Sequence, residues 1–336
     1  MKRILVVNMN YLGDALMTTP TLALLAQAYE ARIDVIAGGA SGYAAEAILR
    51  LVPGIDRLIS RVGGGAMARC RQLFDVIRAG RYDLVVILPS IGIYAFTARL
   101  AGARRIAFVP PIPDAEHMAQ GMLRSVAEQL GLRAGSAEML LHVEQPARDA
   151  AHALLADLEG DAPLIGLNVG ASRPQKRWPA EFFRETLRRL RAQGYAVALL
   201  GASDDGEIAA QALKGAGGDG VIDLTGRTSI GELCAVIERC AAVVTGDTGA
   251  LHIASALQTP VVALFGSTDP LLTGPIGPGQ SRVLYKALAC APCKSHPTCG
   301  GAFTCMASIS PLEVVAAVSE LAEAPLRRPR LRIVAS

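Results

Sequence analysis

A carboxylate stands where the first predicted strand turns into a helix. Asp14 lies one residue after Gly13, shortly beyond the apolar run Ile4–Asn8. In parallel sheets the edge at which the strands end is where ligands bind. A carboxylate held there can take a proton from a hydroxyl group, so Asp14 is our candidate general base. The alternative is that it only stabilises the positive end of the helix dipole.

The segment Asn168–Pro179 combines a turn with cations. It follows another buried run, contains the only tryptophan and one of five lysines, and ends in a proline suited to the first turn of a helix. Ser172 and Lys176 are placed to reach phosphate oxygens near that helix start. We predict an anion site here; the alternative is a solvated basic loop.

A second helix start follows the buried run that ends at Thr245. The backbone N–H groups of Thr248, Gly249 and Ala250 would form a pocket for a diphosphate, and Gly249 lets an anion approach closely. The helix dipole would stabilise negative charge on a leaving group. The alternative makes Asp247 an N-cap and His252 a polar core residue.

Short apolar runs alternate with amphipathic stretches along the whole chain, which is typical of parallel sheets with helices on both faces. The predicted strands are Ile4–Asn8, Ile33–Ala37, Leu84–Leu88, Ile106–Val109, Leu164–Val169, Val197–Leu200, Val221–Leu224, Ala242–Thr245 and Val261–Phe265. The predicted helices are Asp14–Ala28, Gly42–Leu51, Met67–Ala79, Glu116–Leu130, Pro179–Arg191, Asp204–Leu213, Ile230–Arg239, Ala250–Leu257 and Pro311–Glu323.

The alternation restarts after a junction near Pro146–Asp161. We therefore expect an α/β protein with two doubly wound, Rossmann-like domains that face a central cleft. The expected domains are residues 1–150 and 161–315, followed by a helix end and basic tail over 316–336.

Composition and missing motifs exclude several classes. The chain of 336 residues has 51% hydrophobic residues and a formal charge of +3, which does not favour nucleic-acid binding, and no run is apolar for long enough to span a bilayer. It lacks the dinucleotide fingerprint, the phosphate loop and the nucleophile elbow. It also lacks Asp-x-Asp, so protein donors would have to hold a diphosphate.

Three pieces together resemble glycosyltransferase family 9, the ADP-heptose:lipopolysaccharide heptosyltransferases. They are Asn-x-x-x-x-Gly-Asp ending at Asp14, Lys-x-Trp-Pro starting at Lys176, and Asp-Thr-Gly-x-x-His over Asp247–His252 with the following Leu264–Gly266. The resemblance runs from about Lys2 to Val315. It implies a GT-B fold, with the acceptor on the N-terminal domain and the nucleotide sugar on the C-terminal one.

The resemblance also implies a role for each matching residue. Asp14 would be the catalytic base, Lys176 would bind the diphosphate, and Asp247, Thr248, Gly249 and His252 would form the donor turn. The reaction would invert the anomeric centre without a metal or other cofactor, using ADP-heptose as substrate. Asp204 and Glu207, in the acidic loop after Leu200, would face the nucleoside.

Two further groups are candidates for binding. Arg57 and Arg61 belong to an arginine-rich region of the N-terminal half and could attract a phosphorylated acceptor; the alternative is a solvated helix face. Cys290, Cys293, Cys299 and Cys305 have spacing compatible with a structural metal, but we expect reduced thiols and no metal at the site.

The sequence thus predicts transfer of heptose from ADP-L-glycero-D-manno-heptose to a lipid A-core acceptor. The alternatives are another donor sugar, a protein or secondary-metabolite acceptor, a nucleotide-sugar epimerase or hydrolase, or a non-catalytic binding protein. Seven cysteines without an export signal favour the cytoplasm, either free or at the cytoplasmic face of the inner membrane.

Overall fold

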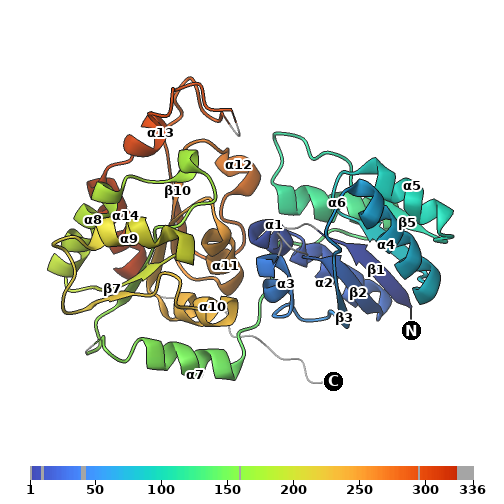
Figure 1. Ribbon diagram of the computed structural model, residues 1–336, viewed down its shortest axis with the longest axis horizontal. Coiled ribbons are helices and arrows are strands. Elements are labelled where there is room, and N and C mark those ends of the chain that lie inside the picture. The colour runs from blue at the N-terminus through green and yellow to red at the C-terminus, as the bar shows by residue number, and fades with distance from the viewer. Residues whose placement is uncertain (1, 9–10, 39–42, 159, 294–295, 324–336) are drawn as a thin grey trace.

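Two parallel β-sheets organise the chain into an N-terminal and a C-terminal lobe (Figure 1). The structure is a computed structural model that describes residues 2–8, 11–38, 43–158, 160–293 and 296–323. Both sheets are covered by helices on both faces. The expected α/β fold with two Rossmann-like domains is confirmed.

The N-terminal sheet has the order β3-β2-β1-β4-β5. Its strands are β1 (Arg3–Val7), β2 (Arg32–Ala37), β3 (Arg57–Ser60), β4 (Leu84–Ile87) and β5 (Ile106–Phe108). The central strand β1 is buried from Ile4 to Val7, which explains its unbroken run of branched residues. Because all strands are parallel, they end at one common edge, and the loop to Asp14 leaves from this edge.

The C-terminal sheet has the order β11-β10-β9-β6-β7-β8. Its strands are β6 (Leu164–Asn168), β7 (Ala196–Leu200), β8 (Val221–Asp223), β9 (Ala242–Gly246), β10 (Val261–Phe265) and β11 (Ser281–Tyr285). Neighbours β6 and β9 are followed directly by the two segments expected to bind anions. The topology therefore brings these segments to one edge, although 77 positions separate Asn168 from Thr245.

One hydrophobic core continues from lobe to lobe. It joins one face of the N-terminal sheet to one face of the C-terminal sheet through the helices between them. These helices are α1 (Leu12–Met17), α2 (Thr19–Tyr29), α3 (Tyr43–Leu49), α6 (Met118–Leu130), α10 (Ile230–Arg239) and α11 (Gly249–Leu257). In Figure 1, α1 of the N-terminal lobe lies beside α11 of the C-terminal lobe.

The two outer faces have separate cores. In the N-terminal lobe, α4 (Ala66–Gly80) and α5 (Gly92–Leu100) cover the sheet. In the C-terminal lobe the cover is α8 (Ala180–Ala192), α9 (Gly206–Leu213) and α14 (Pro311–Glu323). The short helices are η1 (Pro174–Lys176), η2 (Ser203–Asp205), α12 (Pro270–Thr273) and α13 (Thr304–Ala307).

The helix α7 (Gln145–Leu154) spans the domain boundary expected at residue 150. It packs on α10, where Arg148 forms an ion pair of 2.7 Å with Glu238 (Figure 1). Hence α7 lies with the C-terminal lobe. The exact domain limits remain a prediction.

Several elements differ from the sequence-based expectation. The helix expected over Asp14–Ala28 is two helices, because the hydroxyls of Thr18 and Thr19 bond back to the carbonyls of Ala15 and Leu16, at 2.6 and 2.7 Å. The expectation also missed the strands β3 and β11, the helices α5 and α7, and the short helices η1, α12 and α13. Among the described residues, no helix is both long and apolar enough to cross a bilayer.

Trp178 packs into the core of the C-terminal lobe and so anchors the segment Asn168–Pro179, which contains Lys176. Its side chain is 2% exposed, its indole N–H donates to the Ile309 carbonyl at 3.0 Å, and its ring meets Phe182 and Phe183 edge-on. A buried tryptophan with edge-on neighbours fixes the path of the chain around it.

Replacing Trp178 by Ala should lower the free energy of unfolding by about 3–5 kcal/mol, because it removes a large buried side chain and leaves a cavity. Urea denaturation followed by circular dichroism measures this loss. The control Leu312→Ala changes a side chain that is 60% exposed and should cost less than about 0.5 kcal/mol. A loss below about 1 kcal/mol in Trp178→Ala would contradict the anchoring role.

Candidate active site

An ion pair joins the two segments of the C-terminal lobe that are expected to bind anions. The Lys176 ammonium lies 2.7 Å from Oδ2 of Asp247 and also donates to the Asp247 carbonyl at 3.2 Å. The two side chains are 17% and 7% exposed. Lys176 is held there by η1, and Asp247 directly follows β9. The pair therefore places one positive charge beside the start of α11.

The start of α11 is left without a side-chain cap. Thr248 occupies the N-cap position in an extended conformation, but its side chain does not accept a bond from the helix. Instead, its hydroxyl lies 3.0 Å from the Thr245 hydroxyl and 3.3 Å from Nδ2 of Asn168. The network holds the turn, and the Thr248 side chain leaves the first amides of α11 uncapped. Uncapped amides at a helix start are suited to an anion such as a phosphate.

His252 lies one turn into α11 and is 3% exposed. Its Nε2 atom is 3.9 Å from Oδ1 of Asp247. Burial lowers the pKa of His252, although Asp247 opposes this, so the ring is neutral near pH 7. Sequence reasoning offered a donor-site role or a polar core residue, and the observed position agrees with both.

The two lobes meet at α1 and α11. A Cβ atom added to Gly13 would lie 2.5 Å from Cδ2 of His252, and one added to Gly249 would lie 2.8 Å from Cδ2 of Leu12. Only glycine permits this approach at both positions. The contact holds α1, and with it Asp14, against the donor segments of the other lobe.

Asp14 lies within the electrostatic field of the Lys176–Asp247 pair. Burial and, to a smaller extent, the charge of Asp247 raise the pKa of Asp14, Lys176 lowers it, and the net result is a pKa of about 6. A carboxyl group with this pKa is ionised near pH 7 and still accepts a proton readily. The structure thus brings together Asp14, Lys176, Asp247, Thr248, Gly249 and His252, as the sequence motifs suggested.

The acidic loop carries two exposed carboxylates and one buried one, and the nucleoside contacts expected of Asp204 and Glu207 stay predictions. Asp204 and Glu207 are exposed, whereas Asp205 between them is 6% exposed. The Asp205 carboxylate accepts from the Ala202 amide at 2.9 Å and lies against Gly170, where a Cβ atom would be 2.4 Å from Oδ2. The buried carboxylate of this loop is therefore Asp205, which sequence reasoning missed because three acidic residues crowd one turn.

The two candidate arginines lie at opposite edges of the N-terminal sheet. Arg61 directly follows β3, is 6% exposed, and donates to the Asn8 carbonyl at 2.5 Å, close to the end of β1. Burial lowers the pKa of its guanidinium, as does the nearby charge of Arg69. Arg57 begins β3 and lines a pocket at the amino-terminal edge with Arg3. Arg57 therefore lies at the edge opposite Asp14, because parallel strands carry their first residues away from it, and its expected role toward the acceptor is not supported by this position.

The predicted phosphate contact of Ser172 and the expected absence of a metal at the clustered cysteines remain untested. Ser172 is exposed in the loop after β6 and makes no contact that argues for or against phosphate binding. Within the described residues, no group of three or more His, Cys, Asp or Glu side chains is arranged to hold a metal ion. Of the four clustered cysteines, Cys290 is exposed and Cys305 is buried.

His117 connects the two lobes. Its Nδ1 atom accepts from the Ala119 amide and caps α6, while Nε2 lies 3.1 Å from the Gly274 carbonyl of the C-terminal lobe. Burial lowers the pKa of His117, against the effect of the Gly274 carbonyl. No local motif announces this contact, since His117 and Gly274 are 157 positions apart.

Comparison with known proteins decides the family. The family model described as "Glycosyltransferase family 9 (heptosyltransferase)" matches residues 84–301. The chain belongs to glycosyltransferase family 9. The family resemblance of the sequence motifs is thereby confirmed, and the protein is a glycosyltransferase.

Individual relatives agree with this family. Lipooligosaccharide heptosyltransferase 2 of Haemophilus influenzae is 42% identical over 123 residues, a match that spans 35% of this chain and only 36% of that protein. Lipopolysaccharide heptosyltransferase 2 of Salmonella typhimurium is 26% identical over 93% of this chain and 96% of its own length. The solved E. coli ADP-heptose lipopolysaccharide heptosyltransferase II has a TM-score of 0.77 at 24% identity, with 96% and 98% of the two chains covered.

Replacing Asp14 by Asn should stabilise the protein at pH 8 by about 1–3 kcal/mol and have little effect near pH 4. Because the folded-state pKa is raised to about 6, the folded protein retains a proton that the unfolded chain has released. Protonated Asp14 therefore favours the folded state to the full extent below its ordinary pKa. This favourable contribution to the free energy of unfolding is lost as pH rises through about 6.

Urea denaturation of wild type and variant at both pH values measures the difference. The matched control is Asp204→Asn, which removes an exposed carboxylate from the other lobe. The prediction fails if Asp14→Asn gains no more stability at pH 8 than at pH 4, or no more than the control.

Proposed function

We propose that this glycosyltransferase moves heptose from ADP-L-glycero-D-manno-heptose to a sugar hydroxyl of the lipopolysaccharide inner core. The observation that carries the proposal is the placement of Asp14 beside the Lys176–Asp247 pair and the uncapped start of α11. This geometry places a proton acceptor next to a lysine and helix amides that could bind a diphosphate. The names of the Haemophilus, Salmonella and E. coli relatives supply the donor sugar and the class of acceptor.

The proposed reaction is a single displacement with inversion. Asp14 takes the proton of the acceptor hydroxyl while that oxygen forms a bond to the anomeric carbon of heptose. The bond from this carbon to the diphosphate breaks on the opposite face, and its electron pair leaves with ADP. One carboxylate suffices as base, so no covalent intermediate is needed.

The departing ADP gains negative charge, and hydrogen-bond donors of the C-terminal lobe would stabilise this charge. Lys176 has three hydrogens, two of which are directed at Asp247 in the structure. The third hydrogen and the amides at the start of α11 would bind the diphosphate. These donors take the part that a divalent cation plays elsewhere, which supports a metal-independent mechanism.

The acceptor is proposed to approach from the N-terminal lobe. Arg61 lies at the same edge of its sheet as Asp14, and its guanidinium retains a positive charge to attract an anionic sugar or phosphate. His117 and Gly274 would keep the two lobes in register. The reaction would take place in the cytoplasm, where the nucleotide sugar is available.

Release of ADP should require both substrates. We would incubate the protein with ADP-L-glycero-D-manno-heptose alone, with Kdo-lipid A, and with a heptose-terminated core, and measure ADP. Release with one acceptor establishes the transfer and identifies the acceptor. Release of ADP without an acceptor would indicate a hydrolase or epimerase. If ADP were released under none of the three conditions, ADP-heptose would be refuted as the donor.

Asp14→Asn should lower kcat by roughly 10²–10⁴-fold while the dissociation constant for ADP changes less than about threefold, because the amide cannot accept the proton. In the wild type, kcat/KM should fall tenfold per pH unit below about pH 6, as Asp14 becomes protonated. Steady-state kinetics and calorimetric titration with ADP measure both. Normal turnover in Asp14→Asn would rule it out as the base.

A further inference from the structure

The outer surface of the N-terminal lobe carries an unusual share of exposed apolar side chains. Of the 12 large apolar side chains exposed in the described residues, seven lie between positions 62 and 100. Five of these are on two helices, namely Met67, Phe74, Ile93, Phe96 and Leu100, and we call their combined face the α4–α5 surface. Their exposed fractions run from 38% for Phe74 to 86% for Met67.

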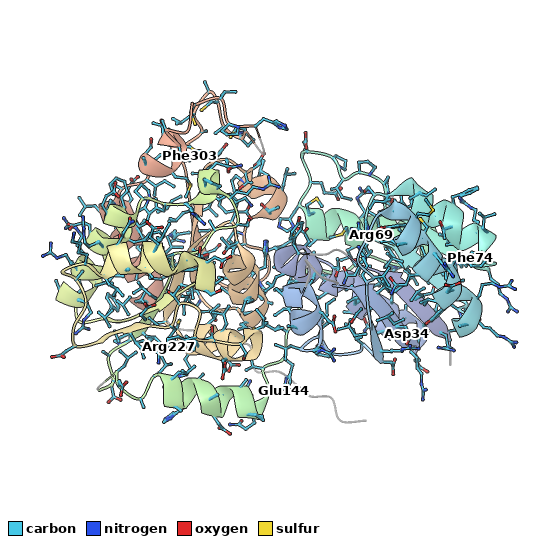
Figure 2. The ribbon with its side chains drawn as sticks, viewed as in Figure 1. Asp34, Arg69, Phe74, Glu144, Arg227 and Phe303 are labelled. Carbon is cyan, nitrogen blue, oxygen red and sulfur yellow. The ribbon has the colours of Figure 1, made fainter. Side chains whose placement is uncertain are left out.

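The helical spacing gathers these side chains on one side. Ile93, Phe96 and Leu100 are three and seven positions apart, which places them on one stripe of α5. Met67 and Phe74 share a stripe of α4 in the same way. Both helices cover the same face of the N-terminal sheet and pack side by side, so both stripes point away from that sheet. Figure 2 shows Phe74 at the outer margin of this lobe, away from the other lobe.

Three arginines lie along or next to the apolar stripes. Arg71 and Arg78 continue the stripe of Met67 and Phe74 along α4, and Arg99 lies beside Leu100 on α5. Residues 62–105 contain seven arginines and two aspartates. The rest of the chain contains 26 basic and 28 acidic residues. The positive charge of the protein is therefore concentrated on this segment.

We propose that the α4–α5 surface docks the protein onto an anionic lipid bilayer. Apolar side chains set among arginines match an interface in which acyl chains lie beneath negatively charged headgroups. A second protein copy would bring the same net positive charge against itself, which charge complementarity disfavours. This inference goes beyond the proposed function, because such binding needs no transfer activity.

The position of this surface also fits an acceptor embedded in lipid. Both helices begin at the sheet edge that carries Asp14, since α4 follows Arg61 and α5 follows the end of β4. Met67 and Ile93 lie in the first turns of these helices. Docking through them would bring the acceptor side of the N-terminal lobe toward the headgroups, while the C-terminal lobe stays on the side of the soluble nucleotide sugar.

The test is co-sedimentation of the full-length protein with acceptor-free vesicles. Vesicles of phosphatidylethanolamine with phosphatidylglycerol should bind at least about tenfold more protein than vesicles of phosphatidylcholine, and added salt should weaken the binding. Leu100→Asp should reduce binding by about tenfold or more, because it places a charge in the apolar stripe. Its matched control is Leu312→Asp, since Leu100 and Leu312 are 62% and 60% exposed and lie in different lobes.

A second variant keeps the test independent of local folding. Arg78→Gln with Arg99→Gln should weaken binding to the anionic vesicles by about fivefold for each arginine. The control pair Arg188→Gln with Arg239→Gln changes exposed arginines of the C-terminal lobe and should leave binding unchanged. Release of ADP with a deacylated, soluble acceptor should be unaffected in Leu100→Asp, which separates docking from catalysis.

Equal binding to both kinds of vesicle, or undiminished binding in Leu100→Asp and in the arginine pair, would overturn the proposal. So would a dimer that sedimentation velocity detects without lipid and that Leu100→Asp dissociates, because the surface would then belong to a second copy. Failure of the ADP-release assay alone would overturn the proposed function and leave vesicle binding intact.

Discussion

The contact between α1 and α11 is the constraint on which the site depends. Gly13 and Gly249 have no side chain at the two points where the lobes come closest, and His252 and Leu12 occupy the space that a Cβ atom would need. The same contact joins the cores of both lobes into one hydrophobic cluster. Packing that stabilises the fold therefore also holds Asp14 against the donor segments. A Cβ atom at either glycine would force the side chain of His252 or Leu12 to shift.

Burial at this contact also sets the chemistry. It raises the pKa of Asp14 to about 6 and lowers the pKa of His252, so one group is a stronger base than an exposed carboxylate and the other is neutral. Lys176 opposes this effect of burial on Asp14, because its positive charge favours the ionised form of Asp14. It also pairs with the negative charge of Asp247. A partly buried carboxylate lowers the stability of the folded protein when it is ionised. Such destabilising groups are common in sites selected for reactivity.

The two lobes differ in the charge and polarity of the side chains that they expose. The C-terminal lobe presents helix amides and one lysine toward a small anionic ligand. The N-terminal lobe carries Arg61 at the sheet edge and, on its outer helices, apolar side chains among arginines. A soluble nucleotide sugar and a lipid-linked acceptor have these same contrasting properties. In the proposed reaction, each substrate would approach the Asp14 site from its own lobe.

The fold class and the family motifs could be predicted from the amino-acid sequence, because strand–helix alternation and short motifs at strand ends are local features. The same motifs gave Asp14, Lys176 and Asp247–His252 as candidates for the site. Which side chains of a crowded segment turn inward, and which edge of a sheet they reach, follows from the tertiary structure. It buries Asp205 between two exposed carboxylates, places Arg57 at the edge opposite Asp14, and brings His117 to Gly274. Burial and contact between the lobes depend on residues far apart in the chain, so no local pattern contains them.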